Sequence, residues 1–197
     1  MTWINKYWKH SLAILLLITS TLALTDGIGI YLKAQLAQWL IEDAWTKTLA
    51  TGHPNKPWPW ADTWPVARLQ TAQANTDLYI LKGASGSSLA FGPGWMEDSV
   101  SPTQPGTKLI AGHRDTHFKF LQHLQPQQTL TLTNASGRQQ RYRVDNIQII
   151  DSSKEQLLID TQQEQLILIT CYPFNAINPD GPQRYIVNAV PTKTLML

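Results

Sequence analysis

Three side chains with complementary chemistry stand beside short apolar runs in this 197-residue chain. Cys171, the single cysteine, directly follows the run Leu166–Thr170. His113 follows a second apolar run, and Arg184 opens a third. A thiolate is a strong nucleophile, an imidazole moves protons near neutral pH, and a guanidinium stabilises a developing oxyanion. If the three runs are strands that deliver these residues to one rim, the trio predicts a nucleophilic site for acyl transfer.

Each of the three residues also has an ordinary interpretation. Free cysteines are often small buried core residues, and a loop histidine or a strand-end arginine is often only a solvated polar group. His113 and His117 have the spacing of a zinc pair, but Arg114 stands where the zinc peptidase pattern needs glutamate. No third ligand is evident unless Cys171 serves, so we expect no metal and no cofactor.

Composition narrows the class of protein further. The formal net charge is only +2, so nothing indicates a nucleic-acid partner. One cysteine forms no internal disulfide, so the cysteine count neither supports nor excludes an oxidising compartment. Outside the apolar N-terminal segment, about 150 residues remain, which is the size of one ordinary domain.

The apolar stretch 12–31 is just long enough to cross a bilayer as a helix. Lys6 and Lys9 precede it, which predicts a cytoplasmic N-terminus and a catalytic domain on the other side. A cleaved signal peptide has the same order of basic and apolar residues, and Asp26 weakens a full span. We expect an uncleaved anchor.

Residues 31–50 continue at helical spacing without Gly or Pro, which predicts an amphipathic helix that runs on from the anchor. Its apolar face has two possible partners, its own domain or the membrane surface. The Pro- and Trp-rich segment 52–64 is typical of an extended connector, and its tryptophans suggest that it packs along the domain surface.

From Pro65 onward, short β-branched and apolar runs alternate with turn residues, which indicates a mainly β domain, a barrel or a sandwich, over 65–197. The chain thus divides into 1–51, 52–64 and 65–197. A hairpin is expected over 128–145, and a short helix over 116–124. The expected strands are 65–69, 78–82, 88–91, 107–111, 128–133, 139–150, 165–170 and 184–190.

The segments around the three reactive residues resemble the sortases, a family of membrane-anchored cysteine transpeptidases. The resemblance rests on Leu109–Phe118, on Leu166–Phe174 with its Thr-Cys pair, and on Arg184–Val187. The linker Lys56–Pro65 resembles the Gram-negative, marine proteobacterial type. This resemblance, which covers about residues 56–190, implies a sortase-type closed β-barrel of about eight strands with short helices, preceded by an N-terminal membrane-anchor helix.

The resemblance also implies a function. Cys171, His113 and Arg184 would be catalytic. Asp115 and His117, which stand close to His113 in the sequence, are candidates to orient it or to line the substrate groove, or are simply polar loop residues, and Thr170 is a further candidate for substrate binding. The partner would be a secreted protein with a C-terminal LPxTG-like sorting signal, and an unidentified amine would accept its acyl group through a thioester. The enzyme would be a single-pass protein of the inner membrane, with its catalytic domain on the periplasmic side. No cluster of acids indicates the calcium site that some sortases have.

Two alternatives remain at this point, and a third lacks its sequence signature. A cysteine peptidase would use the same Cys–His pair and release an acid instead of a new amide. A membrane-tethered binding domain would keep Cys171 as a core residue without catalysis. A cell-wall transpeptidase acting on D-amino acids has a contiguous Ser-His-Gly-Cys signature, which this chain lacks.

Overall fold

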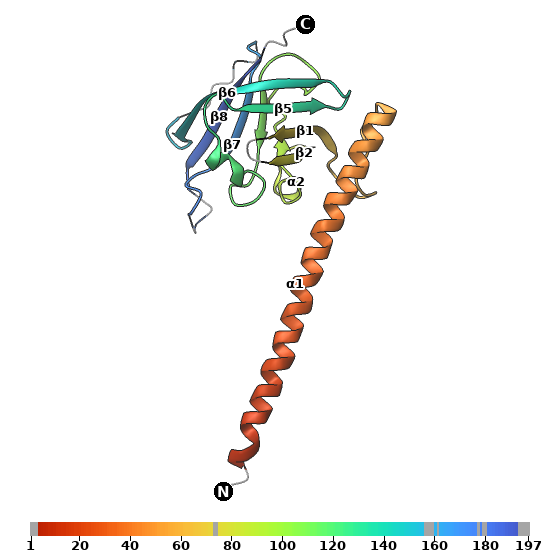
Figure 1. Cartoon of the computed structure of the whole chain (residues 1–197), viewed down its shortest axis with the longest axis vertical. Coiled ribbons are helices and arrows are strands. Elements are labelled where there is room, and N and C mark those ends of the chain that lie inside the picture. The colour runs from red at the N-terminus through yellow and green to blue at the C-terminus, as the bar shows by residue number, and fades with distance from the viewer. Residues whose placement is uncertain are drawn as a thin grey trace. The chain divides into compact units, whose positions relative to one another are not determined.

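The computed structural model describes residues 4–72, 75–155, 160, 162–176, 178 and 181–192. The chain divides into two units, residues 1–39 and 40–197. A long helix, α1, runs through the first unit into the second, and a closed β-barrel makes up most of the second unit (Figure 1).

Helix α1 spans Ile4–Thr51 without a break, so the predicted continuation of the helix over 31–50 is confirmed. It ends at Gly52, whose N–H donates to the carbonyl of Thr48 at 2.9 Å and whose φ is +72°. This left-handed conformation closes a helix at low cost only for glycine, and Pro54 follows. In the described part of the chain, no helix is both long and apolar enough to cross a membrane.

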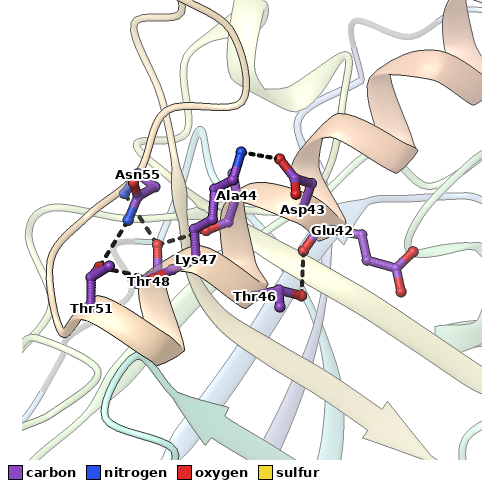
Figure 2. A network of polar contacts seen from close by, with 8 residues as sticks. All are labelled: Glu42, Asp43, Ala44, Thr46, Lys47, Thr48, Thr51 and Asn55. Carbon is purple, nitrogen blue, oxygen red and sulfur yellow. Dashed lines mark hydrogen bonds and ion pairs between the residues drawn. The ribbon is translucent and has the colours of Figure 1, made fainter.

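The last turns of α1 are fixed by packing and by a small polar network. Ile41, Ala44, Trp45 and Thr48 are buried, and the ring centroid of Trp45 lies 6.3 Å from that of Tyr79. Figure 2 shows that Thr48 links the helix to the connector: its hydroxyl donates to the carbonyl of Ala44 at 2.8 Å and accepts the backbone N–H of Asn55 at 3.1 Å. The C-terminal end of the helix is therefore part of the barrel domain.

The connector after Gly52 lies along the barrel, as its tryptophans predict. The ring of Trp58 meets that of Phe91 edge-on, with centroids 5.1 Å apart. The hydroxyl of Thr63 donates to the carbonyl of Lys82 at 2.7 Å. The ammonium of Lys82 lies 4.5 Å from the ring centroid of Trp64, within the range of a cation–π contact.

Eight strands close the barrel in the order β1-β2-β3-β4-β7-β8-β6-β5, with β5 pairing back onto β1, so the predicted closed barrel is confirmed. The pairs β2/β3 and β4/β7 are parallel, and the other pairs are antiparallel. The predicted hairpin is β5/β6. The strands are β1 Pro65–Thr71, β2 Thr76–Lys82, β3 Gly94–Trp95, β4 Lys108–Ala111, β5 Thr129–Asn134, β6 Gln139–Asp151, β7 Leu166–Cys171 and β8 Gln183–Pro191.

Two local predictions are wrong or only partly right. The strand expected at 88–91 is absent; a single helical turn, α2 (Gly86–Leu89), occupies this region, and the third strand is β3 further on. The buried hydroxyl of Ser88 donates to the carbonyl of Gly83 at 3.1 Å, a side chain–backbone bond that favours a turn over an extended strand. The helix expected over 116–124 is shorter, a 3₁₀ turn, η1, over Lys119–His123.

The barrel has one main core and one apolar cluster outside it. Alternating side chains of the strands fill the interior, including Ile110, Leu168 and Val187. The intervening residues Leu109, Ile167 and Ile186 form a second buried cluster on the outer face of β4, β7 and β8. Strand alternation places Cys171 and Arg184 on this same outer face. Cys171 lies two residues after Ile169, and Arg184 lies two residues before Ile186.

Candidate active site

Cys171 and Arg184 are direct partners across the antiparallel strands β7 and β8. Opposite residues in such a pair point to the same face, with Cβ atoms about 5 Å apart. Cys171 is the last residue of its strand, partly buried, and carries a free thiol. The register therefore brings the Cβ atoms of Cys171 and Arg184 together at the rim of the barrel.

His113 reaches the same rim from the parallel neighbour of β7. The register of β4 and β7 pairs Ala111 with Ile169, so His113 and Cys171 each lie two residues beyond this pair. Past the end of β4, the N–H of Gly112 still donates to the carbonyl of Ile169, at 3.2 Å. His113 itself is exposed.

Thr170 ties these two strand ends together. Its hydroxyl donates to the carbonyl of Gly112 at 2.7 Å, and the residue is only 3% exposed. The bond joins the residue before His113 to the residue before Cys171. The Thr170 hydroxyl is thus committed to the hydrogen bonding of the barrel itself, and a substrate contact for this residue stays a prediction.

The loop that carries His113 is anchored at both ends. The N–H of Phe118 donates to the carbonyl of His113 at 2.9 Å, and the Phe118 side chain is fully buried. A Cβ on Gly112 would lie 2.7 Å from the Phe118 ring, which is closer than carbon atoms approach. Glycine at 112 is therefore what lets the loop turn tightly over the core and present His113 outward.

Asp115 and His117, the other predicted substrate-binding residues, lie on this same loop. Asp115 is exposed. His117 is half-buried; burial, and then the charge of the nearby His113, lower its pKa below the ordinary value. The two imidazoles are therefore close enough to interact. No group of three or more His, Cys, Asp or Glu side chains able to hold a metal occurs among the described residues.

The guanidinium of Arg184 is held in place by the loop that leads into β8. Its Nη1 donates to the carbonyl of Gly181 at 2.6 Å and to that of Gln183 at 2.9 Å. An arginine has five N–H donors in a planar fork, so these two bonds fix the orientation of the fork without using its full capacity. Such a group is suited to donate hydrogen bonds to an oxygen on which negative charge develops, and so to stabilise that charge.

Arg114 is a residue of this site that the sequence did not reveal. It is 8% exposed, and its Nη2 donates to the carbonyls of Ala176 at 2.8 Å and Asn178 at 3.0 Å, both in the loop that follows Cys171. The side chain of the residue after His113 thus holds the loop that follows Cys171. In the sequence it stands between exposed His113 and Asp115, and nothing in that pattern marks it as buried.

An aromatic cluster on the other side of the strand pair was also missed. Tyr172 stacks on Tyr185 with ring centroids 6.1 Å apart, and Phe174 meets Tyr185 edge-on at 5.1 Å. Each of the two tyrosines directly adjoins a site residue, Cys171 or Arg184. The cluster packs against the core and stiffens the start of the β7–β8 loop. The aromatic residues flanking Cys171 and Arg184 were a signal that the sequence did contain.

The closed eight-stranded barrel carries a thiol, an imidazole and a guanidinium at one rim. This combination is typical of a β-barrel protein that transfers acyl groups through a cysteine. Comparison with known proteins agrees: the family model of the sortase domain matches residues 69–192. The chain therefore belongs to the sortase family, whose members are cysteine transpeptidases.

The relatives found are sortases of several kinds. Sortase D of Bacillus subtilis (strain 168) is 32% identical over 120 residues, which cover 60% of this chain and 60% of that protein. The catalytic domain of B. anthracis SrtD is 32% identical, with a TM-score of 0.54 over 65% of this chain and 87% of that one. Sortase A from Corynebacterium diphtheriae is 24% identical and shows the same fold, with a TM-score of 0.60 over 68% and 64%.

The match thus spans less than two thirds of the length of the Bacillus subtilis sortase D and of the Corynebacterium diphtheriae sortase A. None of these comparisons bears on the Gram-negative, marine proteobacterial type suggested by the linker, which stays a prediction.

Proposed function

We propose that this protein is a transpeptidase that cleaves a C-terminal LPxTG-like sorting signal of a secreted protein and transfers the new acyl end to an amine. The observation that carries the proposal is the direct pairing of Cys171 with Arg184, at the rim where the parallel neighbour of β7 delivers His113.

In the first half-reaction, the thiolate of Cys171 attacks the carbonyl carbon of the threonine in the signal. The C–S bond forms as negative charge moves to the carbonyl oxygen, which Arg184 stabilises. The tetrahedral intermediate collapses, the C–N bond to glycine breaks, and the imidazolium of His113 protonates the departing amine. A thioester on Cys171 remains.

In the second half-reaction, an acceptor amine attacks the thioester carbonyl and gives a proton to neutral His113. The C–S bond breaks, and the thiolate of Cys171 is restored. A thioester keeps the acyl group reactive, so an amine that is well placed competes with water for it.

The apolar residues beside the thiol support an apolar substrate. Ile169, which is partly buried, lies on the same face as Cys171 and packs against the buried outer cluster of Leu109, Ile167 and Ile186. A leucine and a proline that precede the scissile threonine would bury apolar surface against such a floor, which contributes about 25 cal/mol per Å². This surface supports the LPxTG-like class over a polar peptide.

We also propose that residues 12–31 attach the enzyme to the inner membrane, with the barrel on the periplasmic side. The support is the apolar sequence behind basic residues, and the apolar side chains along it, from Leu12 to Ile18, are 45% to 68% exposed in α1. An enzyme and a substrate that are both tethered to one membrane meet at a raised effective concentration. Membrane fractionation and protease protection of the barrel in spheroplasts test this placement.

The reaction is tested with the full chain, a fluorescent LPxTG-containing peptide and a small amine, with products identified by mass spectrometry. The expected product is the new amide, and Cys171→Ala should bind the peptide but form none. Only acid, even at high amine concentration, would mean a hydrolytic peptidase. No cleavage, together with slow alkylation of Cys171 in the folded protein, would mean a non-catalytic domain.

A further inference from the structure

The short segment that leads into β8, residues 181–183, has each of its backbone carbonyls engaged in a hydrogen bond. Nη1 of Arg184 donates to the carbonyls of Gly181 at 2.6 Å and of Gln183 at 2.9 Å. The carbonyl of Pro182, between them, accepts the backbone N–H of Ser152 at 2.9 Å and its hydroxyl at 2.7 Å. The side chain of Arg184 thus folds back onto the residues before it, and the conformation of this segment decides where the guanidinium lies.

The side of this segment that faces β7 is held by the residue after the nucleophile. The N–H of Tyr172, which directly follows Cys171, donates to the carbonyl of Gln183 at 3.0 Å. The same carbonyl accepts Nη1 of Arg184. One oxygen atom therefore connects the end of the thiol-bearing strand to the guanidinium.

The side that faces β6 is held by Ser152, which belongs to a well-defined turn. Asp151, the last residue of β6, pairs with Gln183, and its Oδ1 accepts the N–H of Ser153 at 3.0 Å and the Ser153 hydroxyl at 2.6 Å. The carbonyl of Asp151 accepts the N–H groups of Lys154 and Glu155, both at 2.9 Å. An aspartate that bonds the backbone two residues on favours a turn, so Ser152 is presented to Pro182 by a braced segment.

Arg184 itself lies between the two braces. It pairs with Cys171 on β7 and with Ile150 on β6. Ser152 is exposed, so water can replace its hydrogen bond and the bond adds little to the stability of the fold. Its effect on geometry is larger, because a donor stabilises an oxyanion only when it lies about 2.7 to 3.1 Å from the position that the oxygen takes.

We propose that Ser152 is a positioning residue for Arg184: it holds the carbonyl of Pro182, and through residues 181–183 it sets the guanidinium where an oxyanion develops. The consequence for catalysis rests on the proposed transpeptidase function. The consequence for the position of the guanidinium does not, so the two are tested separately.

The kinetic test compares Ser152→Ala with the wild type, using the full chain, the LPxTG-containing peptide and the small amine. We expect kcat to fall about five- to tenfold while KM changes less than about twofold, because the oxyanion is stabilised only during the chemical step. Ser152→Thr keeps the hydroxyl and should restore most of the rate. Ser136→Ala is the matched control, because the Ser136 hydroxyl also makes a 2.7 Å bond but lies in the turn at the other end of β6.

Alkylation of Cys171 by iodoacetamide separates positioning from general damage. In this reaction the sulfur displaces iodide from carbon, and no negative charge develops on an oxygen. The rate should therefore be nearly the same in the wild type and in Ser152→Ala, even though peptide transfer is slower. A parallel fall in alkylation and transfer would mean that the substitution disturbs the thiol itself, which would overturn the proposal.

The position of the guanidinium is followed without any substrate, through the Nε–H signal of Arg184 in a ¹H–¹⁵N spectrum, assigned by its loss in Arg184→Lys. This signal should shift in Ser152→Ala but not in Ser136→Ala. If the wild type transfers no peptide, the proposed function fails, and this signal still decides the role of Ser152. An unmoved signal, equal transfer rates in the wild type and Ser152→Ala, or a loss in Ser152→Thr as large as in Ser152→Ala would each overturn the proposal.

Discussion

The hydroxyl of Thr170 and the carbonyl of Gly112 form a buried 2.7 Å hydrogen bond that joins the residues immediately before Cys171 and His113. It crosses from β7 to the extension of β4, where regular strand pairing has just ended. The nucleophile and the proton donor of the proposed reaction are therefore positioned by one shared contact in addition to their strands.

Removing this contact should impair catalysis more than binding. Thr170→Val keeps the side-chain shape but leaves the Gly112 carbonyl without its donor, which costs about 1 to 3 kcal/mol. We expect kcat for peptide transfer to fall while KM changes little, because the apolar floor is untouched. Thr170→Ser should restore most of the rate. Equal losses in the Val and Ser variants, measured by steady-state kinetics and urea unfolding, would contradict this.

Arg114 should control the loop after Cys171. In Arg114→Ala, the carbonyls of Ala176 and Asn178 lose their buried donor, so we expect faster amide hydrogen exchange in residues 174–178 and a lower kcat/KM. Arg114→Lys keeps the charge but not the fork, and should recover only part of the loss.

Arg141→Ala is the matched control for Arg114, because Arg141 is an exposed arginine of the same domain. It should change neither exchange nor activity. If exchange in residues 174–178 is the same in wild type and Arg114→Ala, the two hydrogen bonds do not restrain the loop.

The stability of the barrel should depend on pH through His117. In the folded state, burial and the charge of His113 hold its pKa below 6.5, the ordinary value. As the pH falls through about 6.5, the unfolded chain takes up a proton that the folded chain resists, so the free energy of unfolding decreases until the folded pKa is reached. Urea unfolding from pH 7.5 to 5.5 should show this slope.

His117→Gln is the comparison for the pH experiment. Glutamine does not titrate, so the variant should lose less stability than the wild type over the same range. A wild type and a variant with parallel stability curves would show that another group causes the pH dependence.

Gly112 should not tolerate a side chain. In Gly112→Ala, the new Cβ would meet the Phe118 ring at 2.7 Å, and we expect a loss of about 1 to 3 kcal/mol from overpacking. The shift of Phe118 would also move the His113 loop, so activity should fall. Gly86→Ala, where a Cβ meets nothing within 4 Å, is the control and should unfold at nearly the wild-type urea concentration.

Much of the barrel follows from local pattern. The strict alternation Thr129–Thr133 and the turn after it predicted the β5/β6 hairpin, because strand alternation and turn chemistry act over a few residues. The strand predicted at 88–91 was wrong because the apolar residues there do not indicate the hydrogen bonds that the Ser88 hydroxyl makes. These bonds to the carbonyls of Gly83 and Ser85 hold the chain in a turn. The two-residue strand β3 is too short to show any period.

The sequence by itself determined which chemical groups were available: one thiol, an imidazole behind a glycine, and an arginine at the start of a β run. Their types and neighbours depend only on covalent order. The tertiary structure decided that parallel pairing of β4 with β7 and antiparallel pairing of β7 with β8 bring the three to one rim. It also decided that Arg114 and Thr170 turn inward to hold that rim and that Lys108 is buried at the other end. Register and burial arise from contacts between segments far apart in the chain, which no local pattern records.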